Sequence, residues 1–160
     1  VWRHGDWVEI TENGMLKILG RSDATLNRHG VRIGTAEIYQ IIDKFHDVED
    51  SLVVNLEMPS GDHFMPIFIK MKPAKELTEA LISEISQSLR RDCSPRHIPD
   101  RFIKVDDIPY TISGKKMEAP VKKILLGKSV RNSLNPDAMR NPECLVEYEQ
   151  MALHEDFRGT

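Results

Sequence analysis

The chain has 160 residues, with 22 Lys and Arg against 25 Asp and Glu, a formal net charge of −3 and 40% apolar residues. A chain of this length can bury about 70% of its unfolded surface in one core, and its composition is unlike that of collagen, disordered tails or coiled coils. A dedicated nucleic-acid-binding domain would carry a large basic excess, and the apolar runs are too short to span a bilayer. We therefore expect neither nucleic acid nor a membrane as a partner.

The two cysteines, Cys93 and Cys144, lie far apart and outside any Cys/His motif. Neither a disulfide framework nor a structural zinc site fits this spacing, and the six histidines form no HExxH pair. We expect two reduced thiols and no metal site in this chain.

The first predicted element is a β-hairpin. Two stretches with strand-like composition, residues 7–10 and 15–19, flank Asn13-Gly14, which is a strong local turn signal. An isolated hairpin has too little surface to be stable alone. Because the chain starts with Val1 and not with Met, we expect the hairpin to belong to a larger domain outside this sequence.

The middle of the chain predicts a helix followed by two strands. Residues 26–34 are typical of a turn-rich loop, and a 3.6-residue apolar period then begins at Thr35, which we expect to cap the helix. Strands are expected at residues 52–56 and 67–71. Pro66 has no amide hydrogen to donate, so it predicts a strand start or an edge.

The second half predicts shorter elements. An amphipathic helix is expected over residues 78–91 with Thr78 as its cap, then a strand over 102–105 and an exposed turn over 111–116. The remaining expectations are helices at residues 120–126 and 143–151 and an irregular segment at 94–99. This order predicts an α+β domain from about residue 26 to 127, with a short antiparallel sheet and flanking helices.

Four charged residues offer chemistry that a ligand site can use. The Asp6 carboxylate can accept hydrogen bonds from a cis-diol such as a ribose, while Arg21 and Arg32 carry forked donors suited to phosphate. Lys115 follows a glycine that permits unusual backbone angles. Taken singly, each of these is more often an ordinary surface residue.

In combination, the order of several separated motifs is far more specific. It resembles the end of the acyl-adenylate-forming superfamily, the AMP-forming acyl-CoA synthetases, over about residues 2–127. The motifs that carry the resemblance are Gly5-Asp6, Gly20-Arg-Ser-Asp23, Gly30-Val-Arg-Ile-Gly34 and Ile108-Pro-Tyr-Thr-Ile-Ser-Gly-Lys115.

Within that superfamily the closer likeness is to the members that activate acetoacetate. It is carried by Ser94-Pro-Arg-His-Ile-Pro99, by the stretch that continues from Lys115 to Glu118, and by Asn141-Pro-Glu143 in the tail. The acid substrate expected from this likeness is therefore acetoacetate. An acetyl or propionyl type of synthetase, and a non-catalytic regulatory fragment, remain the alternatives.

The resemblance implies a reaction in two steps. A carboxylate attacks the α-phosphate of ATP to give an acyl-adenylate and pyrophosphate, and the thiol of CoA then displaces AMP. The expected cofactors are ATP or AMP and CoA, with Mg²⁺ arriving on ATP. The resemblance also implies a cytosolic ligase of lipid and ketone-body metabolism whose C-terminal domain swings between the two steps.

The same likeness assigns the catalytic role to Lys115. Its ammonium would bridge the substrate carboxylate and the α-phosphate, where such preorganised contacts are worth about 3–4 kcal/mol each. Lys116 is the rival by one position, and chemistry alone does not separate the two lysines. The family pattern favours the lysine directly after Ser113-Gly114.

Further roles follow residue by residue from the matching motifs. Asp6 would hold the ribose hydroxyls, Arg21 would lie near the ribose and phosphate, and Asp23 would be the hinge. Arg32 would support the pocket of the first step, and Gly30 would line the pantetheine tunnel of the second.

The resemblance also divides the chain. Residues 1–22 would end the large N-terminal adenylation domain, residues 23–127 would form a small mobile C-terminal lid domain, and residues 128–160 would be an extension. The phosphate-binding loop and the acyl pocket of such enzymes lie in the N-terminal domain. We therefore expect the large domain to be the partner of this chain, and the isolated chain to be inactive.

Overall fold

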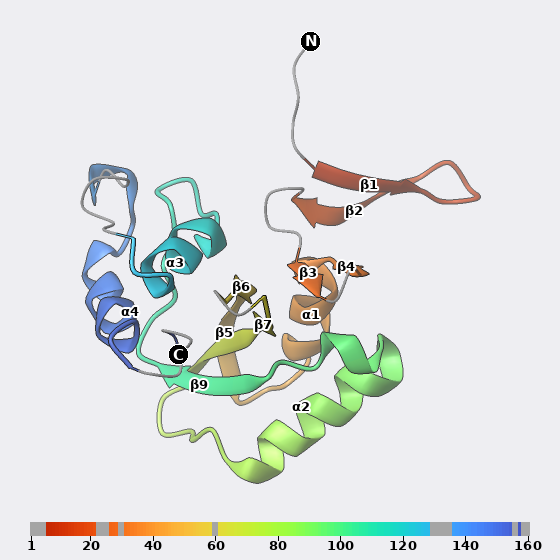
Figure 1. The fold of residues 1–160 in the computed structure, drawn as a ribbon. Helices are drawn as coiled ribbons and strands as arrows, with labels where there is room; N and C mark the ends of the chain where they lie inside the picture. The colour runs from red at the N-terminus through yellow and green to blue at the C-terminus, as the bar shows by residue number, and fades with distance from the viewer. Residues whose placement is uncertain are drawn as a thin grey trace.

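The computed structural model describes residues 6–21, 26–28, 31–58, 61–128, 136–154 and 157 (Figure 1). It confirms the predicted α+β fold: a short sheet at the centre with helices packed around it. The strands are β1 (Asp6–Ile10), β2 (Leu16–Arg21), β3 (Leu26–Arg28), β4 (Val31–Ile33), β5 (Val48–Val53), β6 (Leu56–Glu57), β7 (His63–Phe64), β8 (Pro66–Met71) and β9 (Arg101–Val105). The helices are α1 (Thr35–Ile42), α2 (Glu79–Asp92), α3 (Glu118–Leu125) and α4 (Leu145–Met151).

The predicted N-terminal hairpin is confirmed as the antiparallel pair β1 and β2. Its turn contains Gly14 at φ 76°, a left-handed angle that favours glycine. Apolar side chains of the pair stand in solvent, with Ile10 at 72% and Leu16 at 68% exposed. The hairpin therefore adds little to the hydrophobic core that the described residues form.

The central sheet is mixed, which corrects the expectation of a short antiparallel one. Its strand order is β5-β8-β9, and β8 runs antiparallel to β5 but parallel to β9. The long helix α2 lies between β8 and β9 in the chain. This crossover lets β9 run beside β8 in the same direction. Sequence periodicity predicts strands but not their pairing, so this parallel contact was not predictable.

Three local expectations also need correction. Thr35 does not cap α1: it is the first helical residue and is only 5% exposed, while Gly34 occupies the N-cap without a side-chain bond. Within residues 26–34, the chain forms the short strands β3 and β4 instead of loop alone. The stretch 94–99 contains a 3₁₀ turn, Pro95–His97, because Ser94 accepts a hydrogen bond from the Arg96 amide.

The strand expected at residues 52–56 also needs correction: β5 covers Val48–Val53, where it pairs with β8, and the next strand, β6, covers only Leu56–Glu57. The remaining predicted elements overlap the observed ones. Thr78 caps α2 by accepting a hydrogen bond from the Leu81 amide at 3.2 Å, and Pro66 is the first residue of β8. Both Cys93 and Cys144 are free, as expected.

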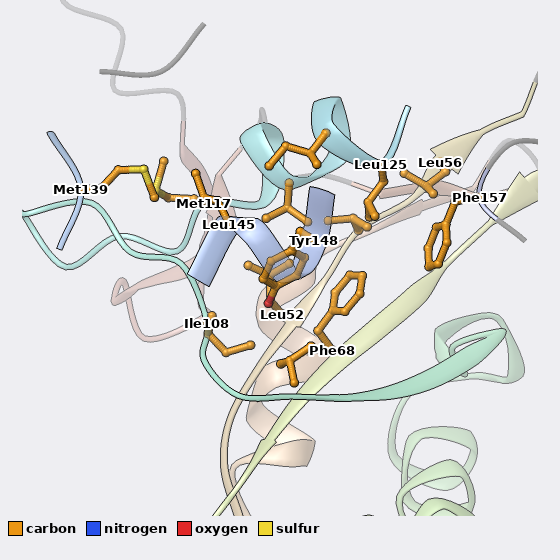
Figure 2. Packing of buried hydrophobic residues seen from close by; sticks show 14 residues of the cluster. Leu52, Leu56, Phe68, Ile108, Met117, Leu125, Met139, Leu145, Tyr148 and Phe157 are labelled. Atoms are coloured by element: carbon orange, nitrogen blue, oxygen red, sulfur yellow. The ribbon is translucent and has the colours of Figure 1, made fainter. Parts of the chain in front are cut away.

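The core lies on both faces of the sheet, because successive side chains of a strand point to opposite sides. Ile67 and Ile69 of β8 face the side covered by α1 and α2, and Phe68 faces the side covered by α3 and α4. Figure 2 shows the second cluster, in which Phe68 and Tyr148 approach each other.

The tail after α3 contributes to this second cluster. The buried residues that it supplies are Met139, Leu145, Tyr148 and Phe157. The described part of the predicted extension is thus packed on the domain. Within the described ranges no helix is long and apolar enough to cross a membrane, and no group of three or more acidic, His or Cys side chains is placed to hold a metal ion.

Candidate functional site

The loop that carries Lys115 is a tight, exposed turn, as predicted. Its two ends meet at an antiparallel bridge between Tyr110 and Lys116. Within it the Thr111 amide donates to the Lys115 carbonyl at 2.9 Å, and the Lys115 amide donates to Thr111 Oγ1 at 3.0 Å. Gly114 supplies the left-handed φ of 78° that closes the turn. The Lys115 side chain is exposed at the tip.

The neighbouring Lys116 points the other way, into the domain. Its ammonium donates to Asp50 Oδ1 and to the Ser51 carbonyl, both at 2.6 Å, and lies 4.1 Å from the centre of the Tyr39 ring. Among the described residues no ion-pair partner is found for Lys115. The structure thus separates two lysines that are adjacent in sequence: one is bound at the base of the turn and one faces solvent.

A polar cluster lies beneath the turn. The Tyr110 hydroxyl donates to Asp50 Oδ2 at 2.6 Å, and the Tyr39 hydroxyl donates to Glu118 Oε1 at 3.1 Å and accepts from the Val53 amide at 3.2 Å. Burial, and then the charge of Glu118, raises the pKa of Tyr39 well above its usual value. Burial, and then the hydrogen bond to Asp50, raises the pKa of Tyr110. Both phenols therefore stay protonated and act as donors.

The tail holds the other side of the turn. The Ile112 amide donates to the Ala138 carbonyl at 3.0 Å, and the Arg140 amide donates to the Tyr110 carbonyl at 2.9 Å. The buried Asn141 accepts from the Tyr110 amide at 3.0 Å and donates to the Ile108 carbonyl at 2.8 Å. The Lys115 turn is therefore fixed between the sheet and the tail.

The remaining predicted site residues lie elsewhere. Asp6 and Arg21 are brought together, because they are directly paired across β1 and β2. Arg32 is an exposed residue of β4. Gly30 and Asp23 lie outside the described residues. The structure thus joins one predicted pair and places Lys115 on a separate loop between β9 and α3.

The chain is similar to known proteins over most of its length. No family model matches the chain. The chain is 47% identical to the acetoacetyl-CoA synthetase of Caenorhabditis elegans over 154 residues, which is 95% of this chain and 22% of that protein. It is 44% identical to the acetoacetyl-coenzyme A synthetase of Rhizobium meliloti (strain 1021) over 145 residues, which is 91% of this chain and 22% of that protein.

A solved structure shows the same likeness in three dimensions. The acetoacetyl-CoA synthetase from Streptomyces lividans superposes with a TM-score of 0.85 at 39% identity, covering 94% of this chain and 22% of that one. This chain is homologous to a segment of the acetoacetyl-CoA synthetases. It spans about a fifth of the length of these relatives, 22% in both cases.

The acetoacetyl-CoA synthetase likeness includes two motif regions that the fold brings together. Arg28, on β3, donates to the Ile98 carbonyl at 2.6 Å and also binds Asp100, which accepts from the Met65 amide at 2.8 Å. His97 contacts Glu37 of α1 at 2.8 Å. The segment 94–99 therefore secures the β3–β4 hairpin and the start of α1.

Sequence reasoning missed Asp50, Tyr110 and Tyr39 as parts of the site. Asp50 lies in the middle of β5, where an acidic side chain in a largely buried strand is a usable signal. The Asn141-Pro-Glu143 motif was noticed, but its partners are about 30 residues earlier in the chain, so no local pattern reveals them.

Proposed function

We propose that this chain is the C-terminal lid domain of an ATP-dependent acid–thiol ligase that makes acetoacetyl-CoA. In the first step an acetoacetate oxygen bonds to the α-phosphorus of ATP, and pyrophosphate leaves. In the second step the CoA sulfur bonds to the acyl carbon, the thiol proton is released, and AMP leaves. The observation that carries the proposal is the exposed Lys115 on a fixed turn, in a chain homologous to acetoacetyl-CoA synthetases.

Lys115 is the proposed catalytic residue of the first step. Its ammonium would bridge the acetoacetate carboxylate and the α-phosphate and offset the negative charge that grows there. An exposed cation on a turn can enter a cleft of a neighbouring domain without unfolding its own. Lys116 is unsuited to this task because Asp50 and Ser51 bind its ammonium.

The remaining roles are proposed from the family motifs. Asp6 and Arg21, paired across the hairpin, would lie at the ribose and phosphate of the nucleotide. Arg32 would support the first-step pocket, Gly30 would line the pantetheine path, and Asp23 would be the hinge. We assign residues 1–22 to the end of the adenylation domain, residues 23–127 to the lid and residues 128–160 to its extension.

The other substrates would bind mainly outside this chain. Within the described residues no acidic cluster could hold Mg²⁺, so the ion would arrive on the phosphates of ATP, where it would neutralise their charge. The isolated chain would have no synthetase activity, because the phosphate loop and acyl pocket belong to the large domain. We place the full-length enzyme in the cytosol.

The test uses the full-length protein and its Lys115→Ala variant. We expect acetoacetate-dependent exchange between ATP and labelled pyrophosphate to fall by about 10²–10³-fold, while CoA thioester formation from supplied acetoacetyl-adenylate persists. Lys123→Ala removes another exposed lysine, on α3, and should leave exchange unchanged. Intact exchange in Lys115→Ala would overturn the assignment. Faster exchange with acetate or propionate than with acetoacetate would overturn the assignment of acetoacetate as the acid substrate.

A further inference from the structure

We propose that Asp50 is a positioning residue for Lys115. Through one carboxylate it holds both ends of the lysine turn, and so fixes where the Lys115 ammonium is presented. This inference rests on the proposed function and deepens it: it names the part of the lid that makes the catalytic lysine ready for the first step.

The geometry is specific because the two carboxylate oxygens bind opposite ends of one turn. Asp50 Oδ2 accepts from the Tyr110 hydroxyl and Oδ1 accepts from the Lys116 ammonium, each at 2.6 Å. Tyr110 and Lys116 are themselves paired across the base of the turn. A single side chain therefore ties together the segment that enters the loop and the segment that leaves it.

The carboxylate beneath the turn is anchored in the central sheet. Asp50 projects from β5, which is hydrogen-bonded to β8 in the centre of the sheet. The side chains of Asp50 and Lys116 are only 20% and 19% exposed, so their ion pair is shielded from solvent. Hydrogen bonds to a charged partner are stronger than neutral ones, and removing one member leaves a buried charge uncompensated.

The Asp50–Lys116 ion pair also makes the two adjacent lysines differ in charge balance. Lys116 is neutralised by Asp50 and stacks against Tyr39, so it adds little positive charge at the tip. Lys115 then presents its own ammonium on a turn whose base is held by the Asp50 hydrogen bonds and the Tyr110–Lys116 bridge. Loss of the Asp50 charge would free the Lys116 side chain and loosen both ends of the turn.

A purely stabilising role predicts different behaviour. A residue that only stabilises the domain would affect both half-reactions, and its effect would persist when Lys115 is absent. A residue that acts through Lys115 affects adenylate formation alone, and its effect disappears once the lysine has been removed. Double mutants therefore distinguish the two roles.

The experiment compares Asp50→Asn, Lys115→Ala and the double variant in the full-length enzyme. We expect Asp50→Asn to lower the kcat of acetoacetate-dependent pyrophosphate exchange by about 10- to 100-fold, because misplacement of about 1 Å has costs of this size. Thioester formation from acetoacetyl-adenylate should stay within about twofold. In the Lys115→Ala background, Asp50→Asn should cause no further loss.

Two more variants keep the test decisive if Asp50→Asn folds poorly. Tyr110→Phe removes only the hydroxyl that binds Asp50 and should lower exchange in the same direction by a smaller factor. Lys116→Arg keeps the charge and should retain more exchange than Lys116→Met. The control Asp92→Asn removes an ion-paired carboxylate at the end of α2 and should leave both half-reactions unchanged.

The outcomes separate the two proposals. Equal loss in both half-reactions, or the same loss with and without Lys115, would overturn the positioning role of Asp50. Unchanged exchange in Asp50→Asn, beside a large loss in Lys115→Ala, would overturn the inference but keep the proposed function. Unchanged exchange in Lys115→Ala would instead overturn the proposed function itself.

Discussion

The rings of Phe68 and Tyr148 meet edge to face, with their centroids 4.9 Å apart and their planes at 66° (Figure 2). Phe68 belongs to the central strand β8 and Tyr148 to α4 in the tail, and both are fully buried. The Tyr148 hydroxyl donates to the Asp107 carbonyl at 3.1 Å. This contact joins the tail to the sheet through both apolar area and a hydrogen bond.

The first prediction concerns Tyr148. Tyr148→Ala should lower the free energy of unfolding by about 3–5 kcal/mol, because it leaves a large cavity against Phe68. Tyr148→Phe keeps the ring and loses one hydrogen bond, so it should cost about 1 kcal/mol. Urea unfolding measures both values. Val146→Ala, at a side chain that is 53% exposed, serves as the control. A cost for Tyr148→Ala as small as that of the control would show that the tail does not stabilise the domain.

The second prediction concerns Asn141, which ties the tail to the segment that enters the lysine turn. Asn141→Leu should cost about 2–3 kcal/mol, because the amide of Tyr110 and the carbonyl of Ile108 lose their partner in a buried site. Hydrogen exchange of the Tyr110 amide should accelerate. Glu149→Ala removes an exposed side chain of α4 and is the control. Unchanged protection of the Tyr110 amide in Asn141→Leu would refute the anchoring role.

The third prediction is a pH dependence at Asp107. Burial opposes ionisation of this carboxyl, but hydrogen bonds from Asn141 and Lys70 together outweigh it and lower its pKa. Because the folded pKa lies below the unfolded value of about 3.9, ionised Asp107 stabilises the fold above that pH. The contribution is lost as pH falls through the folded pKa. Asp107→Asn should therefore be destabilising at pH 7, and the difference from the parent should shrink below about pH 4.

Glu147 serves as a comparison for Asp107, because its pKa is shifted in the opposite direction. Burial raises its pKa, only partly offset by the hydrogen bond from the Asp106 amide. The ionised form thus opposes folding above the folded pKa, and this penalty is absent below the unfolded pKa. Glu147→Gln should become relatively more stable as pH rises through that interval. Urea titrations at several pH values test both variants, and parallel profiles would contradict the assignment of the two carboxyl groups.

Much of the fold follows from local signals. Asn13-Gly14 gives the hairpin turn, Thr78 gives the start of α2, and Gly114 gives the tip of the lysine loop, because each acts within a few residues of itself. The wrong local predictions arise where the outcome depends on distant residues. Nothing local distinguishes Thr35 as a buried first helical residue from Thr35 as a cap, since the difference is set by what packs over it.

The candidate site shows the same division. The order of motifs in the sequence predicted Lys115 as a site residue. The register of β1 and β2 in the structure places Asp6 opposite Arg21. The cluster beneath the turn was not visible, because Asp50 is about 60 residues from Tyr110 in the chain. A hydrogen bond between residues so far apart leaves no periodicity and no short motif.

The sequence by itself determined the kind of domain, the position of the turn and the two lysines that could serve there. Only the tertiary structure shows how those lysines differ, because their difference is one of direction and partner. Lys116 turns inward to a carboxylate on a neighbouring strand, and Lys115 is left to face solvent. Side chains one position apart near a bridge point to opposite sides, and which side is the interior depends on what the rest of the chain places there.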